Sequence, residues 1–125
     1  MPFYEKESSF SFSSVFNLCL YTVREGGHKM LESKFQANLK KELKEMFPGC
    51  IVTKLDSGDI QGIPDLLILH EDKWACLECK KTEKARKQPN QEYYVDKLNE
   101  MSFSSFIYPE NKDEVLHNLQ EAFRR

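Results

Sequence analysis

Two carboxylates and a lysine occur at a spacing that could place both carboxylates around one metal cation, with the lysine nearby. Asp65 and Glu78 have twelve residues between them, and Lys80 follows Glu78 by two. The segment between the carboxylates reads as a hairpin that turns at Glu71-Asp72, and symmetric closure there places Asp65 opposite Glu78. Directly opposed residues of antiparallel strands have Cβ atoms roughly 4.5 to 5.5 Å apart, so both carboxylates could bind one hard divalent cation. Side chains two residues apart in a strand point to the same face, which adds Lys80 to the cluster.

The opposed carboxylates admit two interpretations. Like charges directly across a strand pair destabilise the pair, and a bound divalent metal would remove that cost. Alternatively, the residues form a surface ion cluster in which one carboxylate has a raised pKa or forms a salt bridge with Lys80. The residue types leave both interpretations open.

The four cysteines do not complete a zinc motif. Cys76 and Cys79 have the C-x-x-C spacing, yet neither a second such pair nor spaced histidines provide the remaining ligands of a tetrahedral site. Four cysteines in 125 residues, without a secretory signal, also give little support for disulfides. We therefore expect free thiols.

The wider pattern around the carboxylates resembles one nuclease family. It consists of Gly62-Ile63-Pro64-Asp65-Leu66-Leu67, then Glu78-Cys79-Lys80, then Gln91-Glu92-Tyr93-Tyr94 at the start of a helix. It closely resembles the VRR-NUC branch of the PD-(D/E)xK nuclease superfamily, in which a GxPD strand precedes a (D/E)xK strand and a helix with Q-x-x-H or Q-x-x-Y. The resemblance spans about residues 31–108 and implies a restriction-endonuclease-like core with metal-dependent nuclease activity.

The resemblance implies a role for each residue of the cluster. Asp65, Glu78 and the backbone carbonyl of Cys79 would bind Mg²⁺ or Mn²⁺. Lys80 would orient or activate the attacking water and offset charge that develops on the phosphate. Glu32, on the first expected helix, matches the auxiliary metal-binding acid of the family. The equally weighted alternative is that Glu32 only complements the dipole of that helix.

Further polar residues are expected to contact the site or the substrate. The resemblance implies that Gln91 reaches the catalytic residues from the second long helix, whereas an exposed helix-start residue is the simpler interpretation. Tyr94, which stands where a histidine is often seen in the family, is assigned to nucleic-acid binding. Ser57 and Gln61 lie in a loop before the Asp65 strand and could touch a sugar-phosphate backbone, although most polar loop residues only face solvent.

The net charge does not point to a polyanion partner, but one segment is strongly basic. The formal net charge of the chain is −2. Residues 80–87 nevertheless carry five cations and one anion, a density that either neutralises phosphates or belongs to a solvated loop. The further cations assigned to nucleic-acid binding are Lys81, Lys84, Arg86 and Lys87.

Together these features predict an Mg²⁺- or Mn²⁺-dependent endonuclease that acts on duplex or branched DNA, such as flaps or junctions, without a small-molecule cofactor. The small size resembles nucleases of bacteriophages and mobile elements, and stand-alone relatives of this kind often form homodimers. Restriction-type and tRNA-splicing enzymes share the fold. The main alternative is a non-catalytic nucleic-acid-binding module with the same fold, and a protein-interaction adaptor ranks last.

Hydrophobic periodicity predicts seven elements that position these residues. Apolar residues recur every three or four positions in 31–47, 91–101 and 111–123, which predicts three amphipathic helices, the last with Asn111 as its N-cap. Short apolar runs bounded by turn residues predict strands over 50–55, 64–69, 73–80 and 104–108. The order α-β-β-β-α-β-α indicates a mixed α/β domain with a small sheet flanked by helices.

The chain is expected to contain one domain. Hydrophobic residues at 40% and charged residues at 30% predict a folded chain rather than a disordered one. Residues 1–29, with serine-rich aromatic clusters and a Gly-Gly pair, lack this periodicity. We expect the nuclease domain to cover 30–125, Met30 to be the native start, and 1–29 to be a translated leader or an added sequence. Without a secretory signal or an apolar run of about 20 residues, the expected location is the cytoplasm.

Overall fold

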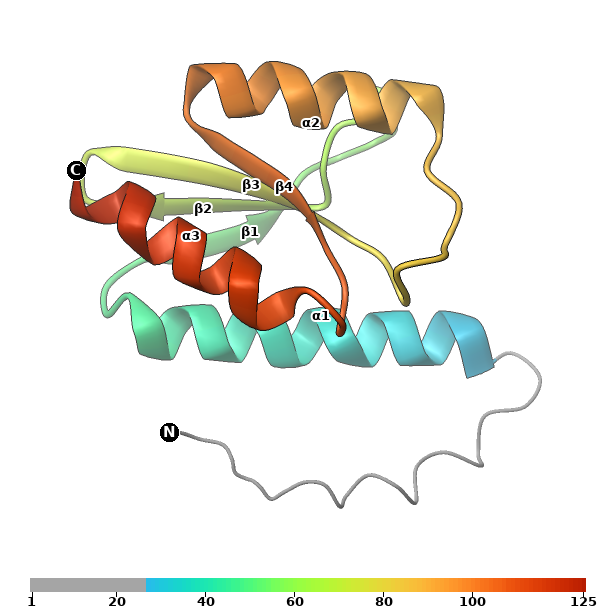
Figure 1. Ribbon diagram of the computed structural model, residues 1–125, viewed down its shortest axis with the longest axis horizontal. Helices are drawn as coiled ribbons and strands as arrows, with labels where there is room; N and C mark the ends of the chain where they lie inside the picture. The colour runs from blue at the N-terminus through green and yellow to red at the C-terminus, as the bar shows by residue number, and fades with distance from the viewer. Residues whose placement is uncertain (1–26) are drawn as a thin grey trace. The chain divides into compact units, whose positions relative to one another are not determined.

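The computed structural model describes residues 27–125 and contains the seven predicted elements in the predicted order (Figure 1). By its contacts the chain divides after Ser33, and the unit Lys34–Arg125 contains the whole sheet. Residues 1–26 of the expected N-terminal extension lie outside the described residues. The elements are α1 (Gly27–Met46), β1 (Ile51–Lys54), β2 (Leu66–His70), β3 (Lys73–Cys79), α2 (Pro89–Met101), β4 (Phe103–Ile107) and α3 (Lys112–Arg124).

The four strands form one mixed sheet in the order β1-β2-β3-β4. Strand β2 pairs antiparallel with both β1 and β3, whereas β4 is parallel to β3 and is connected to it through α2. The register of the hairpin runs from His70 opposite Lys73 to Leu66 opposite Leu77, which confirms the predicted turn at Glu71-Asp72. The paired part of the ladder ends there, one residue before Asp65 and Glu78 would face each other.

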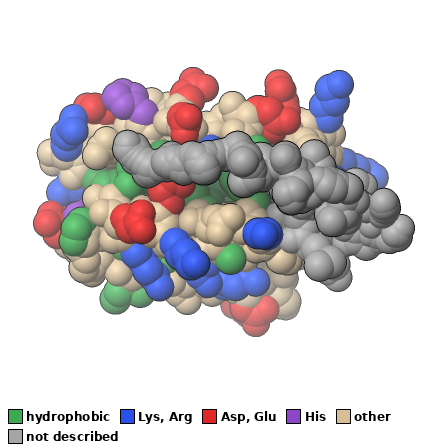
Figure 2. Space-filling model, turned by 90° about the horizontal axis from the view of Figure 1, so that it is seen from below, with side chains coloured by type: hydrophobic (Ala, Val, Ile, Leu, Met, Phe, Trp, Pro, Cys, Tyr) green, Lys and Arg blue, Asp and Glu red, His purple; other side chains and the backbone are tan. Residues whose placement is uncertain are grey.

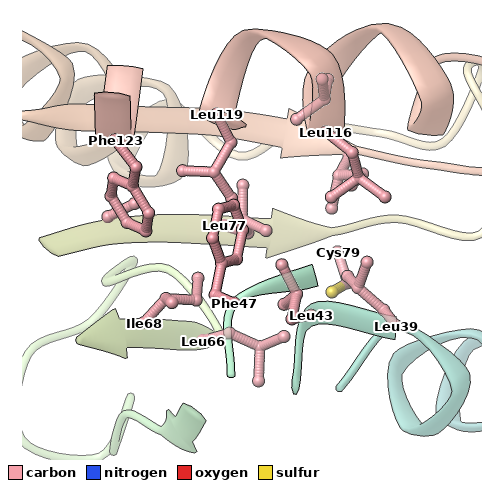
Figure 3. Close-up of a cluster of buried hydrophobic side chains, with 13 residues drawn as sticks. Leu39, Leu43, Phe47, Leu66, Ile68, Leu77, Cys79, Leu116, Leu119 and Phe123 are labelled. Carbon is pink, nitrogen blue, oxygen red and sulfur yellow. The ribbon is translucent and has the colours of Figure 1, made fainter. Parts of the chain in front are cut away.

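Helices cover both faces of the sheet, so that β3 is buried on two sides (Figure 1). Helix α2 lies on one face, and α3 together with the part of α1 after Ser33 lies on the other. On the second face, Leu39 and Leu43 of α1 pack with strand and α3 residues into one apolar cluster (Figure 3). Burial of each such leucine side chain stabilises the folded state by roughly 1.5 to 3 kcal/mol. The predicted amphipathic spacing of α1 therefore attaches the helix to the strands that carry the candidate site.

Most element boundaries lie within two residues of the predicted ones, but α1 begins four residues earlier and the N-cap residue of α3 makes unexpected contacts. Helix α1 begins at Gly27 rather than at residue 31, because nothing among residues 27–30 prevents a helix from continuing by one more turn. Asn111 is the N-cap residue of α3 as predicted, but its side chain does not cap the helix. Its Oδ1 accepts a hydrogen bond from the Tyr108 amide (2.8 Å) and its Nδ2 donates to the Phe106 carbonyl (3.2 Å), so it closes the turn after β4 instead.

The helical face in Figure 2 carries charges of both signs. Seen from the side of α1 and α3, acidic and basic side chains lie among one another on the part of the face that is coloured by residue type (Figure 2). Such mixed charge is usual for the solvated side of amphipathic helices. Within residues 27–125, no helix is both long enough and apolar enough to cross a bilayer.

Candidate active site

Asp65 lies directly before β2 and is bound to the end of β3 through its side chain. Its Oδ2 accepts a hydrogen bond from the Cys79 amide at 2.9 Å, while its backbone carbonyl accepts one from the Leu55 amide at 2.9 Å. The carboxylate thus accepts the hydrogen bond that the Cys79 amide would donate across the β2–β3 ladder if the strand pairing continued. Burial raises the pKa of Asp65, opposed by the Cys79 amide and by the positive charges of Lys80 and Lys54.

Glu78 is the buried acid of the site. It lies near the end of the central strand β3 and is only 3% exposed. Its Oε2 accepts a hydrogen bond from Gln91 Nε2 at 2.8 Å and lies 3.9 Å from Lys80 Nζ. A carboxylate taken out of water to this extent needs charged or hydrogen-bonding neighbours, and these two supply them. The predicted placement of Glu78 and Lys80 on one face of the strand is confirmed by this contact.

Gln91 connects the two charged residues of β3 to helix α2. Its Nε2 donates to Glu78, and its Oε1 accepts hydrogen bonds from Lys80 Nζ (2.8 Å) and from the Gln88 amide (3.0 Å). The residue is half-buried, so the interpretation of Gln91 as an exposed helix-start residue is wrong. One side chain therefore fixes the carboxylate, the ammonium group and the first turn of α2 relative to one another.

Asp65 and Glu78 bring carboxylate oxygens, the donor type that hard divalent cations prefer, to this end of the sheet. Asp65 uses one carboxylate oxygen for the Cys79 amide, and its Oδ1 makes no hydrogen bond within the described part of the chain. Among residues 27–125, no group of three or more His, Cys, Asp and Glu side chains could hold a metal. A cation here would accordingly have two carboxylates, of Asp65 and Glu78, completed by a carbonyl and water. Mg²⁺ is usually bound in this way, because it keeps several of its waters.

A close backbone contact brings α2 to the loop that precedes Asp65. Gly62 has a φ of +94°, and a Cβ at this position would lie 2.5 Å from Asn90 Cβ and 2.8 Å from Asn90 C. Only glycine combines this conformation with so close an approach. The contact holds the first turn of α2, and with it Gln91, against the segment that leads into Asp65.

A pocket of about 660 Å³ opens between this loop and the start of α2. Its lining includes Ser57 and Gln61, both exposed, together with Gln91. The sequence placed Ser57 and Gln61 in one loop and Gln91 on a separate helix, and the fold brings all three to one cavity. Because Gln91 also contacts Glu78 and Lys80, the pocket adjoins the charged cluster.

The basic loop after β3 contains cations of two kinds. Lys84 and Arg86 are exposed, while Lys81 and Lys87 are half-buried. The ammonium group of Lys87 lies over the rings of two β4-end aromatic residues, 5.0 Å from the centroid of Phe106 and 6.0 Å from that of Tyr108. Such cation–π contacts attract a Lys side chain to the rings, so Lys87 attaches the loop to β4. Lys84 and Arg86 are the cations best placed to meet a polyanion.

Two further residues keep the roles predicted for them without a contact that tests those roles. Tyr94 is half-buried on α2, with its ring centroid 5.0 Å from that of Tyr93 in an edge-to-face arrangement. Glu32 is half-buried on α1 within the unit that ends at Ser33, and its role as an auxiliary acid stays a prediction. The predicted free thiols are confirmed for Cys50 and Cys76.

Three residues of the site were not anticipated from the sequence. Lys54, the last residue of β1, lies opposite Leu66, the neighbour of Asp65 in the chain. Its positive charge opposes the rise in the pKa of Asp65. Gln88 and Asn90 contribute through the contacts of α2 described above. Gly62, the glycine of the GxPD pattern, could have indicated the close contact with Asn90. No local sequence pattern indicates the register between β1 and β2.

No protein-family model, curated protein or solved structure matches this chain.

Proposed function

We propose that this protein is a metal-dependent nuclease of the PD-(D/E)xK type, with a restriction-endonuclease-like core, that hydrolyses phosphodiester bonds in DNA. The observation that supports the proposal is the chain of contacts that converges at the end of β3: Asp65 on the Cys79 amide, Glu78 on Gln91, and Gln91 on Lys80. Two hard oxygen donors, a lysine and an orienting amide are the parts that such hydrolysis needs.

The residues would act together on one phosphodiester. Asp65 and Glu78 would hold Mg²⁺ or Mn²⁺. When bound, such a cation supplies a Lewis acid that lowers the pKa of water and offsets negative charge on the phosphate. Lys80 would orient the attacking water and add a positive charge near the developing charge. Gln91, which forms hydrogen bonds with both Glu78 and Lys80, would hold their side chains in position before substrate binds.

A polyanion is the substrate that suits the surroundings of the site. Lys84 and Arg86 are exposed on the loop that follows β3 directly. Neutralising phosphates with such side chains releases counterions, which is the main sequence-independent source of affinity for DNA. Duplex or branched DNA is the proposed substrate, and a homodimer acting on two strands is the proposed assembly.

The test is cleavage by the full chain of labelled duplex, flap and four-way-junction DNA with Mg²⁺, Mn²⁺ or EDTA. Asp65→Asn, Glu78→Gln and Lys80→Ala should each lower cleavage by at least about a hundredfold, because each removes stabilisation of the transition state. The double variant Asp65→Asn/Glu78→Gln should be scarcely slower than either single variant, since one metal needs both carboxylates. Asp72→Asn, which alters an exposed carboxylate outside the site, is the matched control.

The outcome that would reject the proposal is equally specific. Purified parent protein that cleaves no DNA with either metal, and whose melting temperature does not rise on addition of Mg²⁺ or Mn²⁺, is not a metal-dependent nuclease. DNA binding that survives in that case would favour the non-catalytic binding module with the same fold.

A further inference from the structure

The pocket beside the charged cluster has a lining unlike that of a phosphate site. It is formed by glycine, proline and serine together with four side-chain amides, and none of its lining residues is charged. A pocket that received a phosphate would be expected to contain lysine or arginine. Its volume of about 660 Å³ lies within the range typical of sites for small organic groups. The lining therefore fits a neutral group that both donates and accepts hydrogen bonds.

Two of the amides are available to a ligand. Gln61 and Asn90 are exposed, and their side chains make no hydrogen bond within residues 27–125. Each carries an NH₂ donor and a carbonyl acceptor side by side. That pairing matches the Watson–Crick edge of a nucleobase, where a hydrogen-bond donor and an acceptor also lie side by side. Gln91, by contrast, already makes three hydrogen bonds with its amide and only borders the pocket.

We propose that this pocket binds the base of an unpaired nucleotide next to the phosphate that is cleaved. The inference rests on the proposed function for the presence of DNA at the site. The base has to be unpaired, because in a duplex its hydrogen-bonding edge is occupied by the partner base. The pocket and the charged cluster share Gln91, so a nucleotide whose phosphate lies at Glu78 and Lys80 has its base within reach of Gln61 and Asn90. Enzymes that accept extruded bases recognise them through hydrogen bonds of this type.

The test measures binding by the full-length protein in EDTA, where metal-dependent cleavage cannot occur. The two DNA probes are a fully paired duplex and the same duplex with one unpaired 2-aminopurine, a fluorescent adenine analogue. The parent should bind the second probe roughly tenfold more tightly. The fluorescence of the unpaired base should also change on binding. Gln61→Met/Asn90→Ala should lose both effects, whereas Asn118→Ala, which removes an exposed amide on α3, should retain them.

Several outcomes would separate this inference from the proposed function. A parent protein without preference for the unpaired probe, or a double variant that keeps the preference with an unchanged fluorescence response, would overturn the base pocket even if the protein cleaves DNA. Preference and fluorescence response that are lost in the double variant and kept in Asn118→Ala would support it even if cleavage is never observed. Thermal melting of each variant shows whether it folds, and Gln61→Met alone, an exposed change, provides a second variant for the same measurement.

Discussion

Gln91 is the residue on which the arrangement of the site depends most directly. It makes one hydrogen bond to a buried carboxylate, one to an ammonium group and one to a backbone amide. Hydrogen bonds to charged groups contribute about 1.5 to 3 kcal/mol, and a buried carboxylate that loses its donor incurs a further cost. The residue thus links the chemistry of the cluster to the stability of the fold.

Replacement of Gln91 by methionine, which keeps its length and removes its polar atoms, should affect stability and cleavage together. We expect the free energy of unfolding to fall by roughly 2 kcal/mol, because Glu78 stays buried without its amide donor. Urea unfolding in EDTA measures this, and cleavage rates with Mg²⁺ measure the loss of positioning. Gln61→Met is the matched control for the stability measurement, since Gln61 is exposed and makes no hydrogen bond in the described chain. Equal stability of the two variants would contradict the role assigned to Gln91.

The carboxyl group of Asp65 makes the stability of the protein depend on pH. Burial raises its pKa above the ordinary value of 3.8, so the folded chain binds this proton more tightly than the unfolded chain does. The free energy of unfolding therefore falls as the pH rises from about 3.8 through the folded-state pKa. Asp65→Asn should remove this fall and should be more stable than the parent at neutral pH without metal, with no difference well below pH 3.8.

Asp72 provides the control of opposite sign for the same unfolding series. Its hydrogen bond to Lys73 and the charge of that lysine lower the pKa of Asp72. The stability that this group contributes is present above its unfolded-state pKa and is lost as the pH falls, so Asp72→Asn should lose stability at neutral pH. A parent whose pH dependence is the same as that of Asp65→Asn would show that Asp65 is not the group responsible.

At the scale of the elements, the site depends on the position of α2 relative to the hairpin. Contacts of α2 with β3 and β4 hold the body of the helix, while Gly62 and Asn90 hold its first turn. The capping arrangement at Gln88, in which the backbone amide donates to Gln91, fixes where the helix begins. The helix start and the Gln91 side chain are therefore positioned by the same residues.

Gly62→Ala tests this contact, and Gly49→Ala separates its two costs. Both glycines have a positive φ, +94° and +88°, but a Cβ at Gly49 meets nothing within 4 Å, whereas one at Gly62 meets Asn90. Backbone strain should lower the free energy of unfolding of the Gly49 variant by about 1 to 2 kcal/mol. In the Gly62 variant, overpacking should lower the free energy of unfolding by roughly a further 1 to 3 kcal/mol. The cleavage rate of the Gly62 variant should also fall, because Gln91 moves. Chemical unfolding and cleavage assays check both, and equal destabilisation of the two variants would contradict a tight approach at Gly62.

At the scale of the whole molecule, the proposed affinity for DNA would have to come from a local surface rather than from net charge. The chain carries a formal net charge of −2, and the helical face in Figure 2 presents both signs. The exposed cations of the loop after β3 are therefore the expected phosphate-binding groups. Their position next to the end of β3 places them beside the candidate catalytic residues.

The double variant Lys84→Ala/Arg86→Ala should weaken DNA binding and reduce its dependence on salt. The slope of log K against log salt should become shallower by roughly 0.9 for each phosphate of duplex DNA that the variant no longer neutralises. Melting with and without Mg²⁺ should show unchanged metal binding, because neither side chain touches the carboxylates. Lys41→Ala/Lys44→Ala, which changes the net charge equally on the exposed side of α1, is the control. An identical slope in both double variants would mean that the loop only faces solvent.

The sequence by itself determined the hairpin, the helices and the set of candidate catalytic residues. The turn at Glu71-Asp72 fixes a register between neighbouring strands, because each pair in a hairpin follows from the one before it. The period of apolar residues fixes the buried side of each helix in the same local way. Asp65, Glu78 and Lys80 were therefore predictable as a cluster from residues close to one another in the chain.

Only the tertiary structure decided how that cluster is held and what adjoins it. The hydrogen bonds of Gln91, the approach of Asn90 to Gly62 and the charge of Lys54 near Asp65 all join segments whose relative positions follow from the packing of the apolar core. No local pattern encodes such contacts, since each depends on where a helix or an edge strand comes to rest against the sheet. The β2–β3 ladder ends before Asp65, whose carboxylate accepts a hydrogen bond from the Cys79 amide while its backbone carbonyl accepts one from the Leu55 amide.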